Sequence, residues 1–288
     1  MEVSGAPLLQ PPRAGEVRSP AELHRDYLIE KELAGRLRDA TGPERLALYG
    51  TLYDEMYLRT PKHPQLVQKA SEERRARTIG KQFALVRRFR NRNATFLEVG
   101  PGDCTFALAM CAHFKAVIGV DVSPEISRRT DAPANFRLEI SNGVQIPCST
   151  ESIDIVYSNQ LMEHLHPEDA RRQLEEIHRV LKPGGKYICI TPSALSGPHD
   201  ISFYFETSPQ GFHIREYTNL DLTRLFSAVG FRNTACYVGG NKLVFRAPKL
   251  FVTALEKVLL SLPVRWQKRL ARSPFLRPLV KVQVVGTK

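Results

Sequence analysis

A glycine-rich turn at residues 98–104 is the segment whose residue types and spacing point most directly to chemistry. It reads Glu-Val-Gly-Pro-Gly-Asp-Cys and stands between an apolar run and a helical pattern that starts at Thr105. Gly100 and Gly102 allow a tight bend and a close approach of a ligand to the main chain. The start of the following helix offers unpaired N–H groups. Any dinucleotide-binding fold would use such a turn, so alone it predicts only a nucleotide-like ligand.

A second acidic residue stands at the spacing that ribose recognition needs. Asp121 ends the apolar run 116–120 and follows Gly100 by 21 residues. A carboxylate at this distance from the glycine turn commonly accepts hydrogen bonds from ribose hydroxyls. The alternative is that Asp121 only caps a helix or a loop. The turn and Asp121 together predict a cofactor that contains ribose.

These residues belong to a longer pattern that resembles the class I S-adenosylmethionine-dependent methyltransferases, notably their small-molecule enzymes. The resemblance covers roughly residues 93–240 and rests on four segments in the expected order, which are 97–102, Asp121, the turn 141–147 and the pair 153–165 and 179–186. It implies an α/β fold with a Rossmann-like seven-stranded sheet of order 3-2-1-4-5-7-6, in which the last strand is antiparallel. The run 279–285 fits that last strand.

The resemblance also implies the cofactor, S-adenosyl-L-methionine, and the residues that contact it. By position these are Glu98, Gly100, Gly102, Asp121, Val122, Asn142, Gly143 and Asn159. Two positions depart from the family pattern. Cys104 replaces the third glycine, and Asn142 replaces the usual adenine-turn acid. The Asn142 carbonyl can still accept a hydrogen bond from an amino group.

Charge near the turn separates this cofactor from a dinucleotide. S-adenosylmethionine carries a sulfonium and an ammonium but no phosphate, so an acid such as Glu98 suits it. A dinucleotide would place its pyrophosphate at the helix N-terminus. Asp103 stands there and would repel it. The sequence therefore favours S-adenosylmethionine over a nicotinamide cofactor.

Candidate acceptor-site residues follow the fourth and fifth predicted strands, where ligands bind in such sheets. Methyl transfer from a sulfonium needs positioning above all, with a base when the acceptor is a hydroxyl. Histidine titrates nearest neutrality, so the candidate bases are His164, His199 and His213, each with a structural role as its alternative. Residues expected to contact substrate are Glu163, Asp200 (also the candidate partner of His199), Arg215 and Tyr217. No Cys-x-x-Cys pair occurs, and we expect no metal site.

The elements that must position these residues change in character along the chain. Residues 1–20 are rich in Pro, Gly and small residues and predict a flexible tail. Residues 21–92 show helical periodicity, with helices expected over 21–39, 43–58 and 72–90. Residues 93–288 alternate short apolar strands with helices, as in a parallel sheet covered on both faces. A basic amphipathic helical insertion is expected at about 241–278, before the last strand.

The net charge of +11 in 288 residues is concentrated in two segments. Residues 69–92 carry +7 and residues 249–288 carry +8, so the remainder is slightly acidic. Solvated charge on packed helices is the simplest explanation. Peripheral contact of residues 249–272 with an anionic membrane is the sharper hypothesis. The five spread cysteines and the absence of a signal-like N-terminus predict a cytoplasmic protein.

Three functions remain open at this point. The first is methyl transfer to a small molecule, most simply a hydroxyl of a sugar, glycolipid or secondary metabolite. The second is an RNA or protein methyltransferase, which the basic charge suggests. Against it, Ser158-Asn-Gln-Leu161 stands where an Asn/Asp-Pro-Pro-aromatic motif would follow the fourth strand. The third is a non-catalytic or NAD-type nucleotide binder.

Overall fold

The computed structural model describes residues 7–13, 15–67, 72–122, 132–240 and 243–288. Parts of three predicted segments lie outside these residues. They are residues 1–6 and 14 of the tail, 69–71 of the first basic segment and 241–242 of the predicted insertion.

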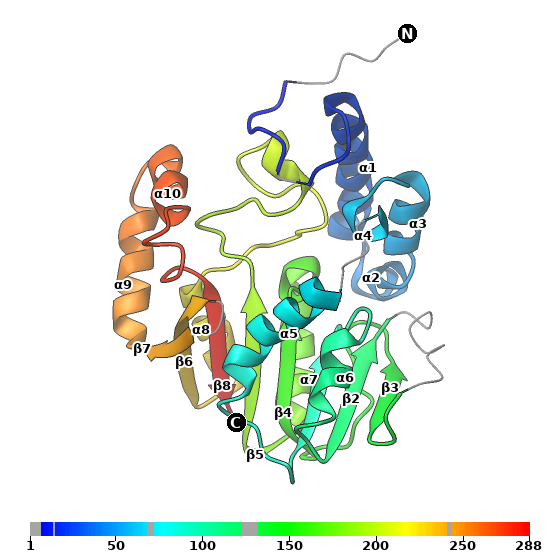
Figure 1. Cartoon of the computed structure of the whole chain (residues 1–288), viewed down its shortest axis with the longest axis vertical. Coiled ribbons are helices and arrows are strands. Elements are labelled where there is room, and N and C mark those ends of the chain that lie inside the picture. Colours follow the sequence, from blue (N-terminus) through cyan, green and yellow to red (C-terminus); the bar gives the residue numbers. More distant parts are fainter. Residues whose placement is uncertain (1–6, 14, 68–71, 123–131, 241–242) are drawn as a thin grey trace.

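An eight-stranded sheet runs through the described residues in the order β3-β2-β1-β4-β5-β8-β6-β7 (Figure 1). The strands are β1 (Thr95–Val99), β2 (Ala116–Asp121), β3 (Phe136–Ile140), β4 (Ile153–Asn159), β5 (Leu181–Thr191), β6 (Asn233–Gly240), β7 (Leu243–Ala247) and β8 (Val282–Thr287). The first five are parallel, and β8 lies antiparallel between β5 and β6. The predicted Rossmann-like order and its antiparallel last strand are confirmed.

The strand count is a correction, because β7 extends the sheet by one edge strand. It pairs antiparallel with β6. Its side chains alternate between exposed Leu243 and Phe245 and buried Val244, which is the pattern of a strand with one covered face. These residues were expected in the helical insertion at about 241–278, although their exposed and buried side chains alternate as in a strand.

Helices cover both faces of the sheet, as the continuous apolar strands predict. Phe96 of β1 packs with the face covered by α5 (Glu72–Val86) and α6 (Thr105–Met110). The next residue, Leu97, packs with the opposite face, which α7 (Pro167–Val180) and α8 (Asn219–Val229) cover. Successive side chains of a strand point to opposite faces, so β1 is buried on both sides.

Four helices precede α5 and lie beyond the carboxyl ends of the parallel strands (Figure 1). They are α1 (Pro20–Asp39), α2 (Gly42–Tyr49), α3 (Leu52–Arg59) and α4 (Pro64–Val67). The expected single helix over 43–58 is wrong, because the chain leaves the helix at Gly50 and Thr51 and starts again. The break lets α2 and α3 place Tyr49 and Tyr53 on the same side of the sheet edge, where both line one hollow.

The chain between β5 and α8 returns over the same edge and meets the N-terminal helices (Figure 1). It contains the short 3-10 helix η3 (Ile201–Tyr204), which contacts α1. Arg38 of α1 donates hydrogen bonds to the carbonyls of Gln210 and Gly211. Segments nearly 200 residues apart thus jointly cover the carboxyl ends of the strands.

Two helices, α9 (Lys249–Leu260) and α10 (Val264–Ala271), stand between β7 and β8. The buried Glu256 carboxylate of α9 accepts hydrogen bonds from the backbone N–H groups of Asn219 and Leu220 at the start of α8. This contact holds α9 against the sheet domain. Among the described residues, no helix is both long and apolar enough to cross a bilayer.

Candidate active site

The turn between β1 and α6 has the tight backbone that its glycines predict. Gly100 and Gly102 adopt φ values of +68° and +55°, and a Cβ on Gly100 would lie 2.9 Å from the Leu161 side chain. Cys104, at the position of the third family glycine, is also left-handed with φ +56°. The turn therefore keeps the backbone path of a glycine although a cysteine occupies the position.

Glu98 is the residue of this region whose surroundings best indicate a ligand. Its side chain is almost fully buried, and its Oε2 atom has no hydrogen-bond partner. Burial, together with the charges of Asp103 and Asp121, raises the pKa of its carboxyl well above the ordinary value. A buried carboxyl oxygen without a partner is costly. The ammonium group of S-adenosylmethionine would satisfy this oxygen, so the site fits the cofactor here.

Asp121 ends β2 and faces the glycine turn. Its Oδ1 accepts a hydrogen bond from Val122 N at 2.8 Å, and its Oδ2 accepts one from Gly102 N at 3.3 Å. These bonds fix the carboxylate beside the turn. Both Asp121 and Val122 line a hollow of about 340 Å³ at the ends of β1 and β2, which we call the β1–β2 hollow.

The predicted adenine turn borders the same hollow, but its contacts differ from the expectation. The Asn142 carbonyl oxygen accepts hydrogen bonds from Val144 N and Gln145 N, so it shapes the turn. Gly143 and Gln145 line the hollow instead. Gln173 of α7 donates to Gly143 O, and its buried Oε1 has no partner. Gln173, which the sequence analysis missed, is thus placed to accept the adenine amino group.

Asn159 ends β4 and lines a hollow next to Glu98 and the glycine turn. This Glu98 hollow shares Gly100, Gly102 and Gln160 with the β1–β2 hollow. The predicted cofactor-binding residues other than Asn142 therefore line two adjoining hollows along the carboxyl ends of β1, β2 and β4.

A third hollow, of about 330 Å³, contains the predicted catalytic histidines, and we call it the histidine hollow. Its polar lining comes from three parts of the chain: the first 65 residues, the β5–α8 segment, and His164, which follows β4. The residues are Arg13, Glu16, Arg18, Glu30, Tyr53, His63, Gln65, His164, His199, Asp200, Tyr204 and His213. Tyr53, Gln65 and His164 also line the β1–β2 hollow. These three residues form a shared wall between the two hollows.

His164 follows β4 in the short 3-10 helix η2 (Met162–His164). Its Nδ1 atom lies 2.8 Å from the Tyr53 hydroxyl and 3.0 Å from the Phe212 carbonyl. Burial and the nearby His213 lower the pKa of its imidazole to about 3. His164 is therefore a neutral ring whose Nδ1 side is held by contacts from two other segments.

His213 and His199 meet at a carboxylate that the sequence analysis did not select. Glu216 Oε1 lies 2.8 Å from His213 Nδ1, and its Oε2 lies 3.1 Å from His199 Nδ1. Burial opposes the charge of Glu216, but these hydrogen bonds outweigh it and lower the pKa of the carboxyl to about 2. The sequence pointed to His213, Arg215 and Tyr217, and the acid that stands among them was the missed signal.

Asp200 is not the partner of His199, which corrects that expectation. Its carboxylate accepts hydrogen bonds from Ser202 N and Gly211 N and so holds the β5–α8 segment together. It still lines the histidine hollow. Asp200 is the N-cap residue of η3, and its side chain accepts the hydrogen bond from Ser202 N.

Arg215 and Tyr217 do not reach the histidine hollow, against the expectation that they contact substrate. The Arg215 guanidinium lies over the Tyr217 ring at 5.1 Å. Both line a separate hollow with residues of α8, and Tyr217 is otherwise buried. The segment is not a regular strand, so residue spacing along it does not predict which side each residue faces.

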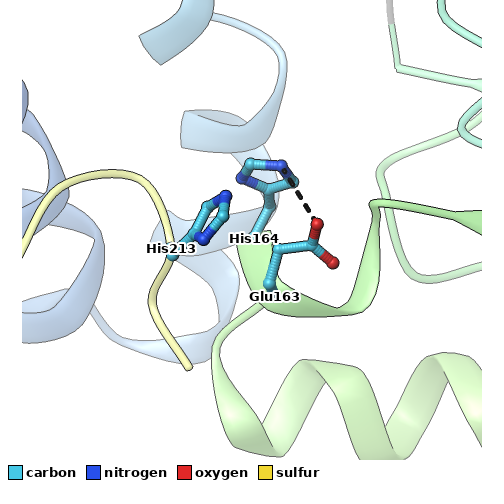
Figure 2. Close-up of side chains that lie close together, drawn as sticks. All are labelled: Glu163, His164 and His213. Atoms are coloured by element: carbon cyan, nitrogen blue, oxygen red, sulfur yellow. Dashed lines mark ion pairs between the residues drawn. The ribbon is translucent and has the colours of Figure 1, made fainter. Parts of the chain in front are cut away.

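Glu163 and His213 lie close to His164 (Figure 2). Both histidines line the histidine hollow, and Glu163 does not. Glu163 is fully buried, and its Oε2 accepts a hydrogen bond from Thr191 Oγ1 at 2.8 Å. Its Oε1 has no hydrogen-bond partner and lies 3.9 Å from His164 Nε2. Burial raises the pKa of the carboxyl to about 7.

The N-terminal helices contribute residues that the sequence analysis did not select, among them Tyr53, Glu30 and His63. Burial, with the charge of Asp200, raises the pKa of Glu30 to about 8. His63, which was not among the candidate bases, also lines the hollow. No local motif marks these residues, because tertiary packing alone brings them to the site.

Comparison with known proteins agrees with this geometry. Residues 97–189 match the family model of the methyltransferase domain. A Mycolicibacterium smegmatis protein named "Probable S-adenosylmethionine-dependent methyltransferase" is 31% identical over 137 residues, which are 47% of this chain and 51% of that protein. The chain thus spans about half the length of the curated relatives it matches.

Two solved structures show the same fold at low identity. Phosphoethanolamine N-methyltransferase 1 of Haemonchus contortus superposes with a TM-score of 0.56 at 14% identity, over 86% of this chain and 50% of that one. A Haloferax volcanii protein, solved in complex with the Trm112 methyltransferase activator, superposes with a TM-score of 0.52 at 18% identity. The superposition covers 74% of this chain and 90% of that one.

The sheet order, the glycine turn with Glu98 and Asp121, and the family match define the class of protein. The chain contains a class I S-adenosylmethionine-dependent methyltransferase domain, as the sequence resemblance predicts. The cofactor of this class is S-adenosyl-L-methionine. The family match therefore favours this cofactor over a dinucleotide.

Proposed function

We propose that the protein transfers the methyl group of S-adenosylmethionine to a hydroxyl of a small polar molecule. One observation carries the proposal: Tyr53, Gln65 and His164 line both the β1–β2 hollow and the histidine hollow. A cofactor bound through Glu98 and Asp121 would therefore lie next to a second hollow that can hold the acceptor, because the same three residues line both hollows. Direct displacement needs this adjacency, because the donor methyl and the acceptor atom must meet in line.

The reaction itself makes modest demands on the protein. A lone pair of the acceptor oxygen attacks the methyl carbon, and the carbon–sulfur bond breaks with its electrons moving to sulfur. The sulfonium becomes the neutral thioether of S-adenosyl-L-homocysteine, and the acceptor loses a proton. Of the three predicted bases, His164 lies in the shared wall, whereas His199 and His213 line the acceptor side. His164 is therefore placed to accept a hydrogen bond from the acceptor hydroxyl, but its lowered pKa makes it a weak base. The raised pKa of His213 makes that ring the better candidate to take the proton.

The lining of the histidine hollow supports a polar acceptor. Arginine, carboxylate, histidine and tyrosine groups outnumber the apolar residues along it. Such groups recognise hydroxyls by hydrogen bonds in both directions. A sugar, the sugar part of a glycolipid or a polar secondary metabolite fits this chemistry better than an apolar ring does.

The test uses the purified chain, S-adenosylmethionine labelled in its methyl group, and cell extract separated into small-molecule, lipid, RNA and protein fractions. We expect label in a small-molecule or glycolipid product, and less of it with His164→Asn. Label only in RNA or protein would instead support the alternative class of methyltransferase. Absence of label from every fraction, with a protein that binds S-adenosylhomocysteine, would contradict the proposed activity.

We also propose that α9 and α10 touch an anionic membrane, as the charge of residues 249–272 suggested. Large apolar side chains are exposed along them beside lysines and arginines, namely Leu250, Phe251, Val258, Leu260, Val264 and Trp266. Apolar anchors beside basic residues favour anionic bilayer surfaces. The protein should co-sediment with phosphatidylserine vesicles and lose this binding in a Phe251→Ser/Trp266→Ser variant. Equal binding of both proteins would contradict the contact.

A further inference from the structure

Three side chains at the histidine hollow lie close together, two of them in its lining and the third buried behind them (Figure 2). They are Glu163 and His164, which follow β4, and His213 from the β5–α8 segment. One ligand atom of each lies within 4.8 Å of the other two. The absence of a Cys-x-x-Cys pair predicted no metal site, but these three ligands include no cysteine. Here 49 residues separate His164 from His213.

The two imidazole rings are oriented by hydrogen-bond partners on their Nδ1 sides, and this orientation suits metal binding. His213 Nδ1 donates to the Glu216 carboxylate, which is an acceptor only, so in the neutral ring the lone pair is on Nε2, and a bound metal ion would displace the proton that Nε2 carries in the charged ring. His164 Nδ1 lies 3.0 Å from the Phe212 carbonyl, and donation to that oxygen leaves its Nε2 likewise a free acceptor. Metal-bound histidines commonly donate their other N–H to a carboxylate or a backbone carbonyl.

The carboxylate of the group points independently to a missing cation. Glu163 is fully buried, and its Oε1 faces the cluster without a hydrogen-bond partner. The nearest histidine nitrogen, His164 Nε2, is 3.9 Å away, which is too far for a hydrogen bond. Its other oxygen is oriented by Thr191. The charge of His213 acts on this carboxylate, but Oε1 itself has no hydrogen bond, and buried carboxylates without one commonly coordinate a metal.

We propose that Glu163, His164 and His213 bind one divalent transition-metal ion at the histidine hollow, beside the wall that His164 shares with the β1–β2 hollow. Two imidazoles and one carboxylate suit Fe²⁺, Mn²⁺, Co²⁺ and Zn²⁺ better than Mg²⁺ or Ca²⁺, which prefer oxygen ligands. Bonds of about 2.0–2.2 Å place ligands about 3–3.5 Å apart. The three side chains therefore close by roughly 1 Å around the ion, which small side-chain rotations allow.

The position of the site gives the ion a use in the proposed reaction, and this step rests on the proposed function. Three protein ligands leave coordination positions open toward the hollow, as in catalytic metal sites. An acceptor hydroxyl bound there becomes more acidic and is held at a fixed point beside the cofactor. The ion would then take the place of a histidine base, because it is bound by the Nε2 atoms that would otherwise accept the proton.

The direct test is a metal titration of the untagged full-length protein after treatment with a chelator. Co²⁺ serves as the probe, because its visible absorption reports the type of ligand. We expect one equivalent to bind with the spectrum of nitrogen and oxygen ligands. No binding of one equivalent, in protein that still binds S-adenosylhomocysteine, would overturn the proposal and leave the cluster as a proton-sharing group.

Variants locate the bound ion. Glu163→Gln and His213→Gln remove a ligand while keeping a similar volume, and each should weaken Co²⁺ binding by 100-fold or more. Glu216→Gln acts only through His213 and should weaken it by about 10- to 100-fold. His113→Gln is the matched control, since His113 stacks on Phe83 at the opposite face of the sheet. Binding unchanged in the ligand variants, or carried by sulfur, would place the ion elsewhere and overturn the assignment.

Parallel measurements keep this test separate from that of the proposed function. Binding of S-adenosylhomocysteine reports whether each variant is folded and retains the cofactor site. Cofactor binding without Co²⁺ binding contradicts the metal site alone. Metal binding without any methylated product supports the site and contradicts the proposed reaction.

Discussion

At the scale of single residues, two buried polar atoms without partners define where the cofactor should bind. Glu98 Oε2 and Gln173 Oε1 lie in adjoining hollows, one beside the glycine turn and one beside the adenine turn. Leaving such atoms unpaired is costly, so both are best explained by groups of a ligand. The first was expected from the sequence. The second could not be, because α7 meets the turn only in the folded chain.

Replacing Glu98 tests the ammonium contact. A hydrogen bond to a charged group contributes about 1.5–3 kcal/mol. Glu98→Gln should therefore weaken S-adenosylhomocysteine binding by roughly 10- to 100-fold, measured by isothermal titration calorimetry. The exposed Glu175 of α7 provides the control, and Glu175→Gln should bind normally. Equal affinities for both variants would exclude Glu98 from the cofactor site.

The raised pKa of Glu98 adds a prediction on proton release. The raised pKa favours the protonated carboxyl in the free protein, and a bound ammonium favours the ionised form. Cofactor binding should therefore release a proton and strengthen as the pH rises toward the free-state pKa. Calorimetric titrations in buffers of different ionisation enthalpy measure this release. Binding heats that do not depend on the buffer would mean that Glu98 does not change its charge.

Gln173 should favour a cofactor with an adenine base over one with a hypoxanthine base. Its Oε1 can accept from an adenine amino group but not from the carbonyl of hypoxanthine. Wild-type protein should bind S-adenosylhomocysteine about tenfold or more tighter than its inosine analogue. Gln173→Leu should lose most of that preference, whereas a variant with unchanged preference would assign base recognition to other groups.

At the scale of elements, contacts between segments distant in sequence assemble the acceptor side. Arg45 of α2 binds the buried carboxylate of Asp169 in α7 and also contacts Glu168. Tyr49 donates to the same Asp169. Hydrogen bonds from Arg45 and Tyr49 overcome the effect of burial and keep the pKa of Asp169 low. This cluster fixes α2 next to the cofactor hollow.

Removing one partner of this cluster should destabilise the fold measurably. Arg45→Ala leaves the buried Asp169 carboxylate with the Tyr49 hydroxyl and the more distant Arg172 guanidinium, and breaking such a buried ion pair costs up to about 3–5 kcal/mol. We expect the melting temperature to fall by roughly 10 °C. Arg171→Ala on the exposed face of α7 is the control and should change it little. A similar melting temperature for both variants would show that the cluster does not hold α2 in place.

At the scale of the whole molecule, prediction from sequence succeeds where the pattern is local. Apolar strands, the glycine turn and the ribose acid follow from residue types and spacing, and all lie where the family order places them. The edge strand β7 was missed because its alternation is short and next to helical sequence. The acceptor side was only partly foreseen. Tyr53, Glu30, His63 and Glu216 enter it through packing of the N-terminal helices against the β5–α8 segment.

The most direct test of the account is the thermal stability of the purified protein with S-adenosylhomocysteine, with NAD as control. A ligand at about 100 times its dissociation constant stabilises the native state by about 2.7 kcal/mol. The midpoint should then rise by roughly 5 °C with S-adenosylhomocysteine and stay unchanged with NAD. An unchanged midpoint with S-adenosylhomocysteine, or a rise with NAD alone, would contradict the assignment of the cofactor site.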